Sequence, residues 1–179
     1  MQSFMKRALI LTGKFVQDHE FIYPYYRVQE EGFEVTVASE DGQETVGALG
    51  TKIPVNAKID DVNPDEYNLL IIPGGAKAME YMRQNKRIIE IISEWNKKGK
   101  VIASICHGSQ LLISARVVKG RKISGYYSIK DDINNAGAEY VDAPFVVDNN
   151  IITSPHYKHL GPWMKEVIRI FNTKNDRTN

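Results

Sequence analysis

The sequence predicts a single α/β domain, residues 1–179, in which a doubly wound, mostly parallel sheet lies between two layers of helices. The first observation behind this prediction is that short β-rich runs alternate with segments of helical periodicity, an order that implies parallel strands joined by right-handed crossovers. The second is the length of 179 residues, 42% of them hydrophobic, which suits one domain with a sizeable core. Residues 1–5 and 173–179 are expected to be frayed ends.

Apolar runs next to turn signals predict the central strands, which are Arg7–Leu11, Phe33–Ala38, Leu69–Ile72 and Lys100–Ile105. The segment between the last two of these strands predicts a helix, because its apolar residues recur at helical spacing and Gly99 stands where a helix would end. These apolar residues are Ile88, Ile91, Ile92 and Trp95.

The second half of the chain predicts three helices and a β-hairpin. The helices are His107–Ala115, Ile129–Ala136 and Leu160–Phe171, and the strands are Glu139–Val141, Phe145–Val147 and Ile151–Thr153. The Asn149-Asn150 pair suits the two-residue turn of a hairpin. Ligands of such sheets bind beyond the carboxyl ends of the strands. Three loops, TGKFVQDHE, PGG and ICHG, converge there, so we expect the functional site at this edge.

The composition excludes several classes of protein. The net charge of +1, from 23 basic and 22 acidic residues, gives no reason to expect binding to nucleic acid or to a membrane surface. No apolar run approaches the roughly 18–20 residues that span a bilayer, and the first apolar run fits a strand better than a signal peptide. A single cysteine cannot form an internal disulfide, so we expect a cytoplasmic location.

The only cysteine stands at the end of a predicted buried strand, in the segment Ser104-Ile105-Cys106-His107-Gly108. This is the small-x-nucleophile-x-Gly pattern of the strand–turn–helix elbow, which exposes a nucleophile at the top of an α/β sheet. The N-terminus of the following helix is expected to favour the thiolate and so to lower the thiol pKa. The alternative is that Cys106 is a small buried hydrophobic residue, as many free cysteines are.

Two further features are expected near Cys106. Gly74 and Gly75 follow a predicted strand and let backbone N–H groups approach a ligand, so they could form an oxyanion hole; the alternative is an ordinary tight turn. Pro24 is typical of the first turn of a helix, which places Glu20 at or just before the helix start. There a protonated Glu20 would donate a hydrogen bond to the thiolate and lower the thiol pKa. The alternative is a solvated acid that stabilises the helix dipole.

The histidines complete the set of candidate residues. His107 follows the nucleophile and could act as a general base if an acid oriented its ring. Glu80 is the best candidate for that acid, from the same chain or a neighbouring subunit, and the alternative is a solvated helix residue. His156 and His159 lie three residues apart, as metal ligands on a helix do, but two prolines interrupt the segment. We expect His156 to line a substrate pocket with Gly74, and we expect no metal and no cofactor.

Taken together, these stretches resemble the ThiJ/PfpI superfamily, which has a class I glutamine amidotransferase-like domain, and most closely its PfpI-like branch of intracellular proteases and deglycases. The resemblance covers the chain from Lys6 to Phe171. It rests on the stretches EFIYPYYRVQEEGFEV, LLIIPGG, VIASICHGSQLLISA, VKGRKISGYYSIKDDINNAGAEYVD and WMKEVIRIF. It implies a flavodoxin-like fold that assembles as a homodimer or a higher homo-oligomer.

The resemblance also implies a role for each candidate residue. Cys106 would be the nucleophile, Glu20 the acid hydrogen-bonded to its sulfur, and Gly75 with the backbone of His107 the oxyanion hole. In the PfpI-like proteases the third catalytic residue is a glutamate of the adjacent subunit, and Glu80 matches its position after one inserted residue. The chain departs from the family at two places on the pocket rim, where it has Gln17 in place of an acid and Pro155-His156 in place of an arginine.

Three functions are compatible with these residues. The first is a cofactor-independent enzyme of the glyoxalase III or deglycase type, which acts on α-oxoaldehydes or their protein or peptide adducts and protects against stress. The second is an intracellular cysteine peptidase with a triad of Cys106, His107 and Glu80, completed across subunits. The third is a redox sensor or chaperone-like stress protein in which Cys106 is oxidised, since an exposed thiol of low pKa readily forms a sulfinic acid.

Overall fold

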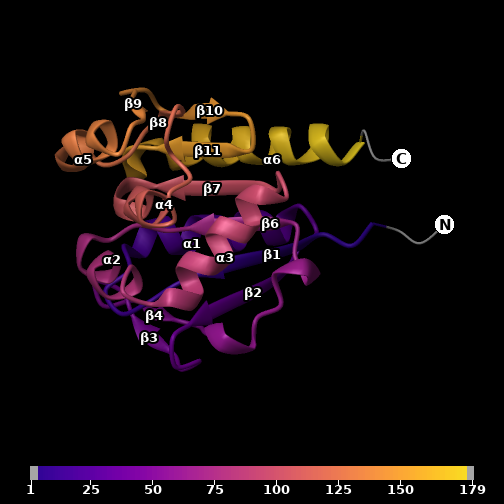
Figure 1. The fold of residues 1–179 in the computed structure, drawn as a ribbon. Helices are drawn as coiled ribbons and strands as arrows, with labels where there is room; N and C mark the ends of the chain where they lie inside the picture. The colour runs from indigo at the N-terminus through magenta and orange to yellow at the C-terminus, as the bar shows by residue number, and fades with distance from the viewer. Residues whose placement is uncertain (1–3, 177–179) are drawn as a thin grey trace.

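The computed structural model describes residues 4–176 and has a seven-stranded sheet at the centre of the fold (Figure 1). The strand order is β10-β11-β7-β6-β1-β2-β5. All neighbouring strands are parallel except β10 and β11, which form an antiparallel hairpin. The strands are β1 (Arg7–Leu11), β2 (Glu34–Ser39), β5 (Ala57–Lys58), β6 (Leu69–Ile72), β7 (Val101–Ile105), β10 (Val146–Asp148) and β11 (Ile151–Ser154).

Within residues 4–176, six α-helices accompany the sheet and cover both of its faces (Figure 1). They are α1 (Asp18–Glu30), α2 (Ala76–Met82), α3 (Lys86–Lys97), α4 (Ser109–Ser114), α5 (Lys130–Asn135) and α6 (Leu160–Asp176). Helices α1 and α6 contact each other and pack on one face, where α6 contacts β7 and β11. Helices α3 and α4 cover the opposite face, with α3 against β7 and α5 beside α4. The predicted fold class, a parallel sheet sandwiched between helices, is confirmed.

Among the described residues, four short strands lie outside the main sheet. They form two small pairs, β3 (Thr45–Val46) with β4 (Lys52–Ile53) and β8 (Lys122–Ile123) with β9 (Glu139–Tyr140). The β3–β4 hairpin stands over the carboxyl ends of β1 and β2, because the Phe15 N–H donates to the Val46 carbonyl and the Ala48 N–H donates to the Val16 carbonyl.

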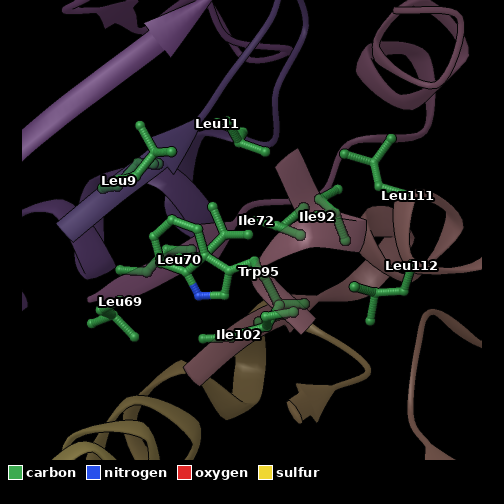
Figure 2. Close-up of a cluster of buried hydrophobic side chains, with 14 of the residues drawn as sticks. Leu9, Leu11, Leu69, Leu70, Ile72, Ile92, Trp95, Ile102, Leu111 and Leu112 are labelled. Atoms are coloured by element: carbon green, nitrogen blue, oxygen red, sulfur yellow. The ribbon is translucent and has the colours of Figure 1, made fainter. Parts of the chain in front are cut away.

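The core is formed by the strands that the apolar runs predict. Strands β6 and β7 are buried along their whole length, as expected for parallel strands covered on both faces. Figure 2 shows Trp95 and Ile92 of α3 packed among leucines and isoleucines of β1, β6, β7 and α4. The buried Trp95 indole is satisfied, since its Nε1–H donates to the Val101 carbonyl at 2.9 Å. The predicted apolar stripe of α3 therefore faces the sheet.

The structure corrects two helix boundaries. Helix α1 begins at Asp18, so Glu20 lies inside its first turn and Pro24 lies well inside the helix rather than near its start. The reason is that the Gln17 side chain accepts the Glu20 N–H and caps the helix earlier than the proline indicated. Helix α6 ends at Asp176, so residues 173–176, predicted to be frayed, belong to the helix. Residues 1–3 and 177–179 lie outside the described residues.

The predicted hairpin is confirmed. Strands β10 and β11 are antiparallel with Asp148 opposite Ile151, and Asn149 has a φ of 52°, as a two-residue hairpin turn requires. Within residues 4–176, no helix combines the length and the apolar composition needed to cross a bilayer.

Candidate active site

Cys106 lies where β7 turns into a 3₁₀ turn, Cys106–Gly108, that leads into α4. Its φ of 60° falls in the left-handed region, which a cysteine rarely adopts and which typically costs about 1–3 kcal/mol. The turn is also tight around Gly108, where a Cβ atom would lie 2.7 Å from Ser104 Oγ and 2.8 Å from the Ile72 carbonyl oxygen. The strained turn with small residues on both sides has the geometry of the predicted elbow.

Several polar groups lie close to the Cys106 sulfur. The backbone N–H groups of His107 and Gly75 both lie near the sulfur, and each favours the thiolate. The His107 ring is also close, with Nδ1 at 3.4 Å from Sγ. The structure therefore brings both predicted donors of the oxyanion hole close to the Cys106 sulfur. The Cys106 residue is 6% exposed.

Glu20 reaches the same point from α1 and is completely buried. Its Oε1 atom accepts the Gly74 N–H at 2.9 Å, and the carboxyl group also interacts with the Cys106 side chain. Among residues 4–176, Oε2 has no hydrogen-bond partner of good geometry. Only glycine fits at position 74, because a Cβ there would lie 2.5 Å from Oε1 and 2.9 Å from the Cys106 Cβ. Gly74 thus contacts Glu20 and Cys106 through its backbone.

Burial shifts the ionisation of the Glu20–Cys106 pair. The pKa of Glu20 is raised to about 7 because burial disfavours the carboxylate, and the Gly74 N–H opposes this effect. Burial, followed by the negative charge of Glu20, also raises the pKa of the Cys106 thiol above its ordinary value. The prediction that the site lowers the thiol pKa is therefore wrong. Burial of the sulfur raises the thiol pKa by more than the N–H groups of His107 and Gly75 lower it. Burial also lowers the pKa of His107.

An aromatic wall, which no feature of the sequence led us to expect, continues from His107. His107 stacks on Tyr126 with ring centroids 4.6 Å apart, and Tyr126 faces His156 at 6.1 Å. His156 contacts Tyr157 at 4.1 Å, and Tyr157 stacks on His19 at 5.1 Å. This series of rings places His156 on the same wall as His107. The tyrosines follow strands in GYYS and PHYKH, and aromatic residues in loops after strands were the available signal.

Glu80 is not part of this arrangement within one chain. It lies on the exposed side of α2, where its Oε2 accepts a hydrogen bond from Lys77 Nζ at 2.8 Å. Among the described residues, no acidic side chain forms a hydrogen bond with the His107 ring. His159 ends a short 3₁₀ turn after His156, and the part of the chain that the structure covers contains no group of three His, Cys, Asp or Glu residues able to hold a metal ion.

Comparison with known proteins identifies relatives of the whole chain. The model of the DJ-1/PfpI family matches residues 6–170. "Deglycase PfpI" of Pyrococcus furiosus is 43% identical over 164 residues, which cover 92% of this chain and 98% of the relative. "Putative cysteine protease YraA" of Bacillus subtilis is 37% identical over 150 residues, covering 83% of this chain and 88% of the relative. The crystal structure of Drosophila melanogaster DJ-1beta matches with a TM-score of 0.86 at 24% identity, covering 95% and 90% of the two chains, which supports the fold alone.

Proposed function

Because the chain belongs to the DJ-1/PfpI family of cysteine-nucleophile enzymes, which includes deglycases, we propose that it is a cofactor-independent enzyme of the glyoxalase III or deglycase type. Its substrates would be α-oxoaldehydes such as methylglyoxal, or the early adducts that these aldehydes form on proteins and peptides. The observation that carries the proposal is the buried Glu20–Cys106 pair, which joins a nucleophile to a carboxyl group with a pKa of about 7. A general acid–base group works best when its pKa lies near the operating pH.

In the proposed reaction on methylglyoxal, Cys106 Sγ adds to the aldehyde carbon as Glu20 takes up the thiol proton. The N–H groups of Gly75 and His107, which lie near the sulfur, would stabilise the negative charge that develops on the aldehyde oxygen. Glu20 returns the thiol proton to the oxygen of the resulting hemithioacetal, and Glu20 or His107 then moves the proton of the aldehyde carbon to the neighbouring carbonyl carbon. The product is a lactoyl thioester on Cys106, and water hydrolyses this thioester to lactate and the free thiol.

On a protein adduct, the carbon attacked is the carbinolamine carbon formed from the aldehyde and an amine. The S–C bond forms, the C–N bond breaks, and the leaving amine takes a proton from Glu20. The intermediate left on Cys106 is the same hemithioacetal, so a single site would process free aldehydes and glycated side chains. A small carbonyl compound or a glycated protein or peptide is therefore the proposed partner, and protection against carbonyl stress is the proposed role.

A peptidase is the second candidate, supported by the name of the Bacillus subtilis relative. Its triad would need an acid for His107. Glu80 is exposed on α2, and among residues 4–176 its carboxylate pairs only with Lys77. An adjacent subunit of a homodimer or a larger homo-oligomer would then have to supply Glu80. The sensor hypothesis draws less support, because Cys106 is 6% exposed and its thiol pKa is raised, whereas peroxide attacks accessible thiolates.

The test compares wild type with Cys106→Ser and Glu20→Gln on methylglyoxal, following lactate, and on a fluorogenic peptide. We expect wild type to form lactate, Cys106→Ser to form none, and Glu20→Gln to lose most of the activity because it cannot accept the thiol proton. If wild type cleaves the peptide and Glu80→Gln does not, the result would favour the peptidase. If neither substrate is consumed while mild peroxide yields a stable sulfinic acid at Cys106, the enzyme proposals fail and the sensor hypothesis replaces them.

A further inference from the structure

The aromatic wall begins at the nucleophile itself. His107 Nδ1 lies 3.4 Å from Cys106 Sγ, and the planes of the stacked His107 and Tyr126 rings meet at an angle of 27°. The Tyr126 backbone is attached to the same turn, because its N–H donates to the Cys106 carbonyl at 3.1 Å. The elbow therefore holds the start of the wall beside the sulfur.

Farther from the sulfur, the wall is open to solvent. Tyr127 adjoins it, with its ring centroid 5.6 Å from that of Tyr126 and 6.2 Å from that of His156. Tyr127 is 39% exposed and Tyr157 is 44% exposed. Aromatic and apolar side chains grouped beside a reactive residue are typical of a binding surface. The wall is therefore an extension of the Cys106 site and not a part of the hydrophobic core.

The imidazoles near the nucleophile are neutral. His156 Nδ1 accepts the Lys158 N–H at 3.1 Å, so the ring proton of His156 lies on Nε2. Burial, followed by the charges of Lys158 and His159, lowers the pKa of His156, and burial lowers the pKa of His107. Both rings are therefore uncharged near neutral pH.

Gln17 fixes the histidine at the other end of the wall in the same way. Its Oε1 accepts the Glu20 N–H at 2.9 Å, so its Nε2 is the donor that faces His19 Nδ1 at 3.0 Å. A His19 ring that accepts at Nδ1 carries its proton on Nε2 and is neutral. Gln17 and His156 belong to the two places where the pocket rim departs from the family, so both departures act on the wall.

These charges favour a neutral ring over a cationic group as the ligand of the wall. Lys158 Nζ lies 5.5 Å from the centroid of the Tyr127 ring, and its positive charge would repel an ammonium or guanidinium group placed there. Uncharged imidazole and phenol rings attract another aromatic ring through offset-stacked or edge-to-face contacts. The wall therefore suits a neutral aromatic ring.

We propose that the aromatic wall binds an aromatic substituent of the substrate, so that the enzyme prefers aryl α-oxoaldehydes such as phenylglyoxal to saturated ones of the same size. This inference rests on the proposed glyoxalase-type function and names the substrate class of the same site. The substituent is attached to the carbon next to the one that Sγ attacks, within reach of His107 and Tyr126. The chemistry is that proposed above: the aldehyde carbon is oxidised, the neighbouring carbon is reduced, water adds, and phenylglyoxal gives mandelate.

Binding of unreactive probes to the full chain tests the wall without catalysis. The probe is mandelate, and its matched control is hexahydromandelate, which carries the same acid and hydroxyl groups on a saturated ring. In two-dimensional NMR of labelled protein, we expect mandelate to shift the amides of residues 126–127 and 156–158 and to bind about fivefold more tightly than the control. Equal binding of the two probes, or no shift at these amides, would overturn the inference. So would shifts of these amides on dilution of the protein without a response to mandelate, since a second copy of the chain would then cover the wall.

Variants assign the preference to the wall. The quantity compared is the ratio of kcat/KM for phenylglyoxal to that for cyclohexylglyoxal, because the intrinsic reactivity of the two aldehydes is the same for every variant and cancels. We expect Tyr126→Leu to lower this ratio about fivefold, Tyr127→Leu to lower it about twofold, and Tyr126→Phe to keep it. Tyr26→Leu, at an exposed tyrosine of α1 outside the wall, should also keep it.

The outcomes separate this inference from the proposed function. If wild type, Tyr126→Leu and Tyr127→Leu all consume the two aldehydes with the same ratio, the inference fails and the proposed function stands. If wild type consumes neither aldehyde and forms no lactate from methylglyoxal, the proposed function fails and the substrate role of the wall fails with it. The probe measurements still decide in that case whether the wall binds aromatic rings.

Discussion

The most direct physical test of the site concerns the proton on Glu20. The carboxyl group is 0% exposed, and its pKa is raised to about 7 from its ordinary value of 4.5, chiefly by burial. The folded protein therefore holds this proton more tightly than the unfolded chain does. The associated stability is complete below pH 4.5 and is lost as the pH rises through about 7. At about 1.4 kcal/mol per pH unit, the loss amounts to about 3 kcal/mol.

Glu20→Gln replaces the carboxyl group by a neutral amide of nearly the same shape, so the variant has no proton to lose at this position. We expect its free energy of unfolding, relative to that of wild type, to rise by about 3 kcal/mol between about pH 4 and about pH 8. Urea unfolding of both proteins at the two pH values measures this double difference. The titration of other groups and any fixed cost of placing an amide beside Cys106 cancel in it.

Two controls separate burial from other causes. Glu94→Gln, at an exposed position on α3, should change the same double difference by less than about 0.5 kcal/mol. Because burial is the largest cause of the shift, most of the effect should persist when both proteins also carry Cys106→Ser. A relative stability of Glu20→Gln that is the same at both pH values would refute the reasoning, since Glu20 would then ionise in the folded protein at no cost.

The remaining predictions concern groups that hold the site and its surroundings. Gly74→Ala should lower activity about a hundredfold, because its Cβ would lie 2.5 Å from a buried carboxyl oxygen, whereas Gly161→Ala, in open space, should leave activity intact. Asp18→Asn should cost about 1–3 kcal/mol and speed amide exchange in segment 47–51, because the Asp18 carboxylate accepts two backbone N–H groups there. Glu80→Gln should change the stability of a single chain by less than about 1 kcal/mol in urea, because Glu80 is exposed.

The sheet could be predicted from the sequence where burial dictates composition. Strands β1 and β6 have the predicted bounds, because parallel strands covered on both faces read as continuous apolar runs. The two-residue strands β3, β4 and β5 carry no such signal. Their positions depend on distant groups, such as the Asp18 carboxylate that binds the loop between β3 and β4. Contacts of this kind do not show in local periodicity.

The same limit applies to the site. The elbow at Cys106 could be predicted because its small residues and its glycine are adjacent in sequence. That Glu20 meets Cys106 could be anticipated from the shared edge of the sheet and from the family resemblance, but not from the local sequence around either residue. The direction of the thiol pKa could not be anticipated, because it depends on how completely the folded chain excludes water from the sulfur. The ring contacts of Tyr126 and Tyr157 likewise arise between loops that are far apart in the chain.

The raised pKa of the thiol restricts how the proposed reaction can begin. A resting thiolate is disfavoured by burial and by the charge of Glu20, so the sulfur has to lose its proton as it attacks. Glu20 is suited to receive that proton, because a carboxyl group with a pKa of about 7 is a far stronger base than an ordinary one and still returns the proton near neutral pH. The N–H groups of Gly75 and His107 stabilise the negative charge that develops as the thiol loses its proton. We therefore expect reactivity toward a carbonyl carbon to follow the ionisation of Glu20, with slow alkylation of the resting thiol by iodoacetamide at neutral pH; rapid alkylation at that pH would contradict this order of events.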